Sequence, residues 1–106
     1  MICRIWHGWA SRENADAYER LLRTEIFHGI ANRGIAGYRG IELLRRDESE
    51  PIEFVTLMWF DSLQDVSAFA GADYEIAVVP PEARALLLRF DERSAHYDVR
   101  QPRAMP

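Results

Sequence analysis

The stretch Phe54-Val-Thr-Leu-Met-Trp-Phe-Asp61 decides the fold, because it predicts a strand that is apolar on both faces. Alternate side chains of a strand point to opposite faces. One face carries Val55, Leu57 and Trp59, and the other carries Phe54, Met58 and Phe60. A strand that is dry on both sides needs a covering layer on each, and the rest of the chain supplies only one. We expect a second copy of the protein to supply the other.

The elements before this strand are predicted from alternation, capping and helical spacing. Residues 2–10 form a first strand, and Ser11 then caps a helix. Apolar side chains recur along that helix at helical spacing until glycines interrupt it at 29–34. Residues 38–46 form the second strand, which a polar turn at 47–51 joins to the third in a hairpin.

The elements after it are a second helix and a last strand. Ser62 caps the helix, which carries Val66 and Phe69 on its apolar side. Pro80-Pro81 ends the helical region, and a further helical turn restarts at Glu82 and uses Ala83, Leu86 and Leu87. Residues 93–100 form the fourth strand.

The order strand, helix, strand, strand, helix, strand predicts an α+β fold of the ferredoxin-like βαββαβ type. Its four-stranded antiparallel sheet carries both helices on one face, because the crossovers are right-handed. We expect one domain over residues 1–100 and a C-terminal tail over 101–106. The bare sheet face includes large apolar side chains, which is unusual on a monomer. The prediction is a homodimer formed through the open sheet face.

The composition limits which classes of partner and which cellular compartment we expect for the protein. The chain has 106 residues and a formal net charge of -4, so it lacks the basic balance that nucleic-acid binding favours. No segment approaches the roughly 20 apolar residues of a membrane span. Its one cysteine, Cys3, cannot form an internal disulfide, which favours a reducing compartment. We expect a cytoplasmic protein with no nucleic-acid or membrane partner.

Few residues suggest chemistry by their type and position. His96 lies in a predicted strand and is either a proton acceptor or a buried, hydrogen-bonded imidazole. Arg4 and Arg39 interrupt apolar strands, where a guanidinium needs a partner. They either hold a substrate carboxylate or enolate, or pair with Glu42 or Asp98. No metal is expected, because the histidines at 7, 28 and 96 have no ligand spacing.

The residues 53–69, together with His96-Tyr-Asp-Val99, resemble the antibiotic biosynthesis monooxygenase-like family. This resemblance implies a dimeric α+β barrel with a ligand cavity between sheet and helices, where cofactor-independent members oxidise activated aromatic compounds. Trp59 matches the family's tryptophan position and is expected to reach toward the helices as a flat wall or a core residue. Tyr74 lies where family pockets often receive a hydrogen-bonding residue.

The resemblance also argues against haem, since relatives that degrade haem place an axial histidine where this chain has Ala77, Val78 and Val79. We therefore predict no cofactor. The predicted function is a monooxygenase-like activity on a small aromatic or quinol-like compound. The catalytic residue would be His96, and the substrate-binding residues would be Trp59, Tyr74, Arg4 and Trp6. The alternatives are a non-catalytic dimer that binds a small apolar ligand and an isomerase or lactone-processing enzyme.

Overall fold

The sheet is antiparallel throughout in the computed structural model, which describes residues 1–104. Its strands are β1 (Ile2–Ala10), β2 (Tyr38–Arg46), β3 (Ile52–Phe60), β4 (Leu87–Phe90) and β5 (Ala95–Asp98). The strand order is β2-β3-β1-β4, and β5 also pairs with β1. Because β4 and β5 lie along the same edge of β1, they act as one interrupted fourth strand. The predicted ferredoxin-like order and the bounds of the first two strands are confirmed.

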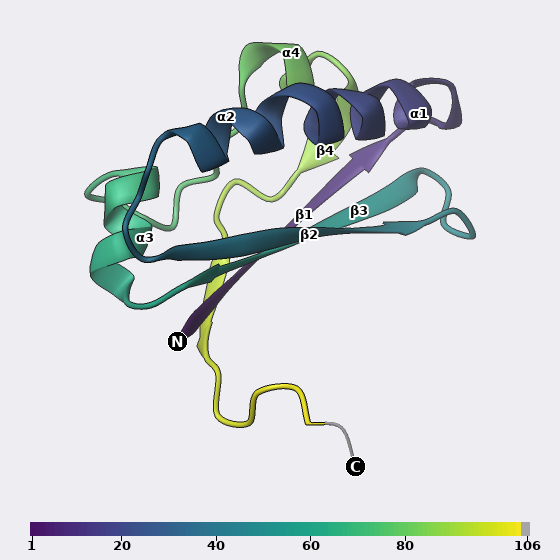
Figure 1. Ribbon diagram of the computed structural model, residues 1–106. Helices are drawn as coiled ribbons and strands as arrows, with labels where there is room; N and C mark the ends of the chain where they lie inside the picture. Colours follow the sequence, from purple (N-terminus) through teal and green to yellow (C-terminus); the bar gives the residue numbers. More distant parts are fainter. Residues whose placement is uncertain (105–106) are drawn as a thin grey trace.

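The helices lie on one side of the sheet (Figure 1). A long helix follows β1 and contains a π-helical turn, so that its parts are α1 (Arg12–Leu21), η1 (Leu22–Ile26) and α2 (Phe27–Asn32). Two shorter helices follow β3, namely α3 (Leu63–Ala70) and α4 (Pro81–Arg84). Both predicted caps are confirmed, since Ser11 Oγ accepts from Asn14 N at 3.1 Å and Ser62 Oγ accepts from Asp65 N at 3.3 Å. No helix within residues 1–104 is long and apolar enough to cross a membrane.

The buried side chains under the helices form two clusters. One cluster surrounds Tyr18 and Phe54, whose ring centroids are 4.9 Å apart. The other surrounds Phe60 and Phe69, whose ring centroids are 5.8 Å apart. The division leaves room between the clusters, and the candidate site lies there.

The helices cover the face of β3 that carries Phe54, Met58 and Phe60, all of which are buried. Trp59 lies on the opposite face, level with Cys3 on one neighbouring strand and Gly40 on the other. The expectation that Trp59 reaches toward the helices was therefore wrong. A strand that is apolar on both sides does not indicate which side the helices choose, so alternation alone could not decide it.

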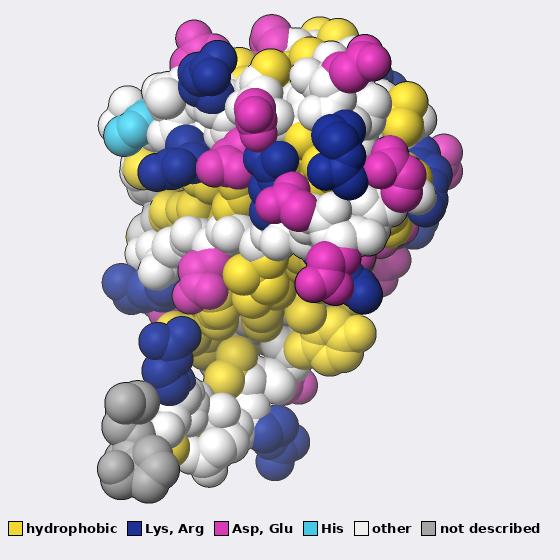
Figure 2. Space-filling model, turned by 90° about the vertical axis from the view of Figure 1, so that its right-hand side faces the viewer, with side chains coloured by type: hydrophobic (Ala, Val, Ile, Leu, Met, Phe, Trp, Pro, Cys, Tyr) yellow, Lys and Arg dark blue, Asp and Glu magenta, His cyan; other side chains and the backbone are white. Residues whose placement is uncertain are grey.

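The other sheet face has no covering layer among the described residues. Burial alternates along β1 and β3, so that every second side chain stays partly exposed on this face. Figure 2 shows hydrophobic side chains gathered below the charged upper part of the molecule, on the side away from the helices. Leu44 and Tyr97, which lie beside Val55 and Cys3 on this face, are 45% and 57% exposed.

The end of the chain departs from the prediction at two places. Leu86 and Leu87 do not extend the short helix, because α4 ends at Arg84 and Leu87 begins β4. The last strand is shorter than 93–100, since residues 92–94 leave the ladder and contact the segment before α4. There Ser94 N donates to Glu75 O at 2.6 Å and Ala77 N donates to Glu92 O at 2.9 Å. Within the predicted tail, Met105 and Pro106 lie outside the described residues.

Candidate functional site

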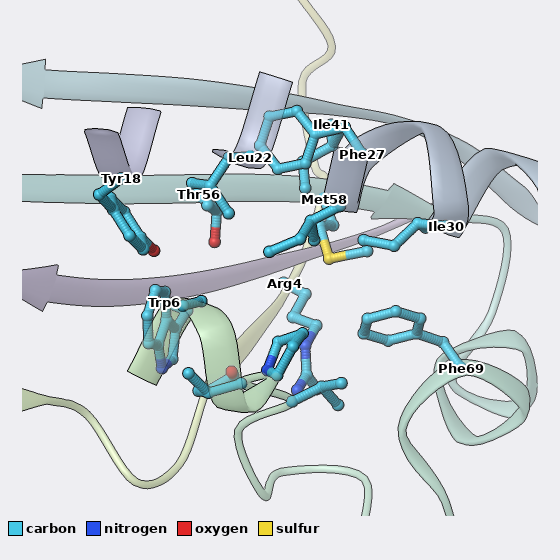
Figure 3. A pocket seen from close by; sticks show the side chains of 16 residues that line it. Arg4, Trp6, Tyr18, Leu22, Phe27, Ile30, Ile41, Thr56, Met58 and Phe69 are labelled. Carbon is cyan, nitrogen blue, oxygen red and sulfur yellow. The ribbon is translucent and has the colours of Figure 1, made fainter. Parts of the chain in front are cut away.

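An apolar cavity lies between the sheet and the helices, and we call it the sheet–helix cavity (Figure 3). Its volume is about 60 Å³. The long helix contributes Tyr18, Leu22, Ile26, Phe27 and Ile30, the sheet contributes Arg4, Trp6, Ile41, Thr56 and Met58, and the second half of the chain contributes Phe69, Val78, Val79, Pro80, Ala83 and Ser94. The π-helical turn lies within the stretch that lines the cavity, a placement common for such turns at functional sites.

Arg4 brings a cation to this apolar wall. It is only 3% exposed, and its guanidinium lies 5.6 Å from the centroid of the Phe69 ring. Nη1 donates to the Tyr74 carbonyl and Nη2 to the Ile76 carbonyl, the latter at 3.1 Å. The expected pairing with Glu42 or Asp98 was wrong, since no carboxylate within residues 1–104 forms an ion pair with Arg4.

Burial lowers the pKa of Arg4 to about 10, because the charged form loses its hydration. The guanidinium therefore stays protonated at neutral pH. The site holds a buried positive charge that backbone carbonyl dipoles stabilise in part.

His96 contacts Arg4, with Nε2 3.0 Å from Nη1. A guanidinium only donates, so Nε2 must be the acceptor and the proton of the neutral imidazole lies on Nδ1. Burial, followed by the charge of Arg4, lowers the pKa of His96. His96 does not line the cavity, and its connection to the cavity lining is the contact with Arg4.

Tyr74 joins the same group through its backbone and its ring. Its carbonyl accepts from Arg4, and its ring packs edge-on against His96 with centroids 5.1 Å apart. The predicted hydrogen bond from the Tyr74 hydroxyl to a ligand stays a prediction, because Tyr74 lies outside the cavity lining. Arg4, Tyr74 and His96 are thus brought together as predicted site residues, while Trp59 is on the far side of the sheet.

Trp6 lines the cavity next to Arg4 along β1, as its even position on the strand requires. Its indole Nε1 donates to the Asp91 carbonyl at 2.7 Å, which fixes the ring. A Cβ placed on Gly8 would lie 2.8 Å from Trp6 Cη2. The absence of a side chain at position 8 therefore makes room for this wall.

Three hydroxyl residues were not among the sequence predictions. The hydroxyls of Tyr18 and Thr56 point into the space between the lining side chains (Figure 3). Burial raises the pKa of Tyr18, so its phenol stays neutral. Ser94 is 4% exposed, and its Oγ is buried without a hydrogen-bond partner in the described part of the chain. Thr56 had a signal in the sequence, as a polar residue on the core-facing side of an apolar strand.

The remaining candidates lie away from the cavity. Arg39 is on the surface and forms a bidentate pair with Asp61, at 2.9 Å from Nε and 2.7 Å from Nη2. Its expected partners, Glu42 and Asp98, were wrong. On the open sheet face, His7 Nδ1 lies 2.8 Å from Glu53 Oε2. Among residues 1–104, no group of three or more His, Cys, Asp or Glu is placed to hold a metal ion.

No family model matches the sequence, and neither does any curated protein. Solved structures do match the fold, and two of them are described here. One is a "putative antibiotic biosynthesis monooxygenase" from Nitrosomonas europaea, with a TM-score of 0.69 and 10% identity, over 95% of this chain and 100% of that chain. The other carries the same description, comes from Deinococcus radiodurans, and has a TM-score of 0.68 and 16% identity over 100% and 99%.

The chain shares their fold. The predicted α+β, ferredoxin-like architecture of antibiotic biosynthesis monooxygenase-like structures is thereby confirmed. At these identities the likeness concerns the fold alone, because one fold serves many chemistries. The function must therefore be argued from the cavity.

Proposed function

We propose that the protein is a cofactor-independent, monooxygenase-like protein that binds a small aromatic or quinol-like compound in the sheet–helix cavity. The observation that carries this proposal is the buried guanidinium of Arg4 on the wall of an otherwise apolar cavity. Aromatic walls suit a flat ring, and a fixed cation suits an oxygen that becomes negative during the reaction. The compared structures of this fold bear monooxygenase descriptions, which agrees with the proposal.

The chemistry needs no group beyond the substrate and oxygen. Loss of a proton turns the substrate into an enolate or phenolate, and its carbanion form reacts with O₂. For a ring methylene the balance is R₂CH₂ plus O₂ giving R₂C=O plus H₂O. Arg4 stabilises the oxyanion, because a preorganised donor in a dry site costs no reorganisation.

His96 is the proposed proton acceptor, and its contact with Arg4 sets a condition for that role. The Nε2 lone pair accepts from Arg4 Nη1, so it can take a proton only after Arg4 turns away. A substrate oxygen that draws the guanidinium toward the cavity would release the imidazole before the proton is transferred. Binding of the substrate oxygen and proton acceptance are therefore coupled through one hydrogen bond.

The size of the cavity constrains how a ligand enters. About 60 Å³ holds roughly two waters, far below the roughly 300 to 1,000 Å³ of ordinary ligand sites. A six-membered ring therefore enters only when lining side chains move. Phe27 and Ile30 on the long helix and Val78 and Val79 on the opposite side are at least partly exposed, and they are the side chains that can move with least loss of packing.

Oxygen consumption with anthrone and 1,4-dihydroxynaphthalene tests the proposal against buffer blanks. Arg4→Gln is expected to lower kcat/KM by about 100-fold or more, since loss of one oxyanion donor costs roughly 10²–10³ in rate. His96→Ala is expected to lower kcat by about 10²-fold or more. The control Arg12→Gln changes an exposed arginine and should leave the rate unchanged. Oxygen uptake that never exceeds the blank would refute the activity.

The narrow cavity favours a second candidate, a non-catalytic protein that binds a small ligand. Such a protein would bind the same compounds reversibly without consuming oxygen. Binding measured by calorimetry beside the oxygen assay separates the two functions.

We further propose that the protein is a homodimer through its open sheet face. The support is the row of partly exposed apolar side chains on that face, with Ile5, Val55 and Leu57 at adjacent positions on two strands. Covering such a face removes apolar surface from water at about 25 cal/mol per Å². The isologous contact of two identical faces is the commonest way to do so.

A further inference from the structure

Arg4 differs from five surface arginines of the chain in the groups that accept from its guanidinium. Arg12, Arg23, Arg39, Arg45 and Arg93 each form an ion pair with a carboxylate at or near the surface. Arg4 is buried and has only carbonyls and an imidazole as acceptors. A buried charge is costly unless an opposite charge meets it. The protein thus keeps a buried cation that has no carboxylate partner among residues 1–104.

Arg4 has N–H donors that no group within residues 1–104 accepts from. The guanidinium has five N–H groups. Nη1 uses two on Tyr74 and His96, and Nη2 uses one on Ile76. The Nε–H and the second Nη2–H have no acceptor among residues 1–104. Two donors of a buried cation are therefore available to a ligand.

Ser94 supplies a second, independent observation. Ser94 lines the same cavity, and its hydroxyl is buried and has no partner within the described chain. A buried hydroxyl without a partner costs free energy, and such groups are rare in folded proteins. A ligand oxygen that accepts from Ser94 would remove that cost.

We propose that the cavity takes its ligand as an anion, a compact apolar acid whose ionised oxygen binds Arg4 and Ser94 while its ring packs against Trp6 and Phe69. The inference deepens the proposed function because it concerns the same cavity, and it names the substrate class. The ionised oxygen belongs to a carboxylate or a phenolate, which share this chemistry. Arg4 is then the residue that selects charged ligands over neutral ones of the same shape.

Calorimetric binding of benzoate and of benzamide, its neutral isostere, tests the proposal on the unmodified chain. Charge-assisted hydrogen bonds are about twice as strong as neutral ones, so benzoate should bind at least about 10-fold more tightly. 4-Nitrophenol, measured on both sides of its own ionisation, identifies a phenolate: its affinity should rise with ionisation if the site accepts that source. Equal affinity for benzoate and benzamide, or no binding of benzoate, would overturn the proposal.

Variants locate the effect at Arg4. Arg4→Met keeps an unbranched apolar stem without the charge and should reduce the benzoate to benzamide ratio to about one, while Arg4→Lys should retain part of it. Ser94→Ala should weaken benzoate several-fold and benzamide less, because a hydroxyl donates more strongly to an ionised oxygen than to an amide carbonyl. Arg12→Met, an exposed control, should keep the full ratio. A ratio that survives Arg4→Met in a folded variant, checked by circular dichroism, would contradict the role of Arg4.

The two proposals fail separately. Charge selectivity without oxygen uptake leaves an anion-binding protein and removes the oxygenase. Oxygen uptake with neutral substrates and no charge selectivity keeps the oxygenase and removes the proposal of an anionic ligand.

Discussion

At the residue scale, the position along a strand decided which predicted site residues meet. Arg4 and Trp6 share a face of β1 because their positions differ by two, and that face is the one under the helices. Trp59 is also a tryptophan, but it occupies an odd position of β3, and the side chains that face the core of β3 are at even positions. The sequence allowed Arg4 to be singled out as a guanidinium in an apolar strand. It could not reveal that Arg4 lacks a carboxylate, since that depends on contacts across the fold.

His96 should make stability depend on pH. Burial and Arg4 lower its pKa below the ordinary value near 6.5. Between the lowered folded pKa and about 6.5 the unfolded chain binds more protons, so the free energy of unfolding falls as pH falls through this window. Urea unfolding at pH 5 to 8 should show a smaller loss for His96→Gln than for the wild type. The exposed control His28→Gln should behave like the wild type, and identical pH profiles for all three would refute this account of His96.

Gly8 should be intolerant of a side chain. Gly8→Ala places a Cβ 2.8 Å from Trp6 Cη2, and the overpacking is expected to lower the free energy of unfolding by about 1–3 kcal/mol. Displacement of Trp6 should also weaken ligand binding in the cavity. Gly29→Ala is the matched control, because its Cβ meets nothing within 4 Å and Gly29 lies inside α2. It should raise stability by about 0.5–1 kcal/mol in urea unfolding. Equal stabilisation by both substitutions would contradict the close approach of Trp6.

At the element scale, local signals predicted what local physics determines. Serine caps fixed the starts of α1 and α3, and alternation fixed β1 and β2. The π-helical turn, which lies in the stretch of the long helix that lines the cavity, has no such local signal. The split of the last strand escaped prediction for the same reason. Residues 92–94 leave the sheet and bond to backbone groups of a segment distant in the sequence.

The Ser11 cap offers a test at this scale. Ser11→Ala removes the acceptor of Asn14 N and should lower the free energy of unfolding by about 1 kcal/mol. Ser11→Asp keeps an acceptor at the helix start and should retain nearly the full stability. Thermal and urea unfolding measure both. A cost for Ser11→Asp as large as that for Ser11→Ala would show that the hydroxyl acts otherwise than as a cap.

At the scale of the whole molecule, β3 is apolar on both faces, and this feature is the basis for proposing a second copy of the chain. One face is covered by helices and holds the cavity, while the other keeps Ile5, Val55 and Leu57 partly exposed. The sequence indicated that a second layer was needed but not which face would lack it. We thus propose that the helix-covered face of the sheet binds the ligand and that the open face binds the partner copy.

A charge at the centre of the open face should separate the copies. Leu57 lies between Ile5 and Glu42 on neighbouring strands, so Leu57→Glu would bury an unpaired anion beside a second carboxylate in the proposed interface. Light scattering should report a folded monomer. Leu63→Glu, on the 41% exposed side chain of α3, is the matched control and should leave the assembly unchanged. Equal masses for the two variants would argue against this interface.

Sedimentation of the unmodified chain at micromolar concentration is the most direct measurement of whether one copy can leave its sheet uncovered. One chain has a mass of 12.3 kDa, and the expected result is twice that mass. Dilution within the micromolar range should cause little dissociation. A stable, well-behaved monomer at every concentration would contradict the requirement for a second covering layer.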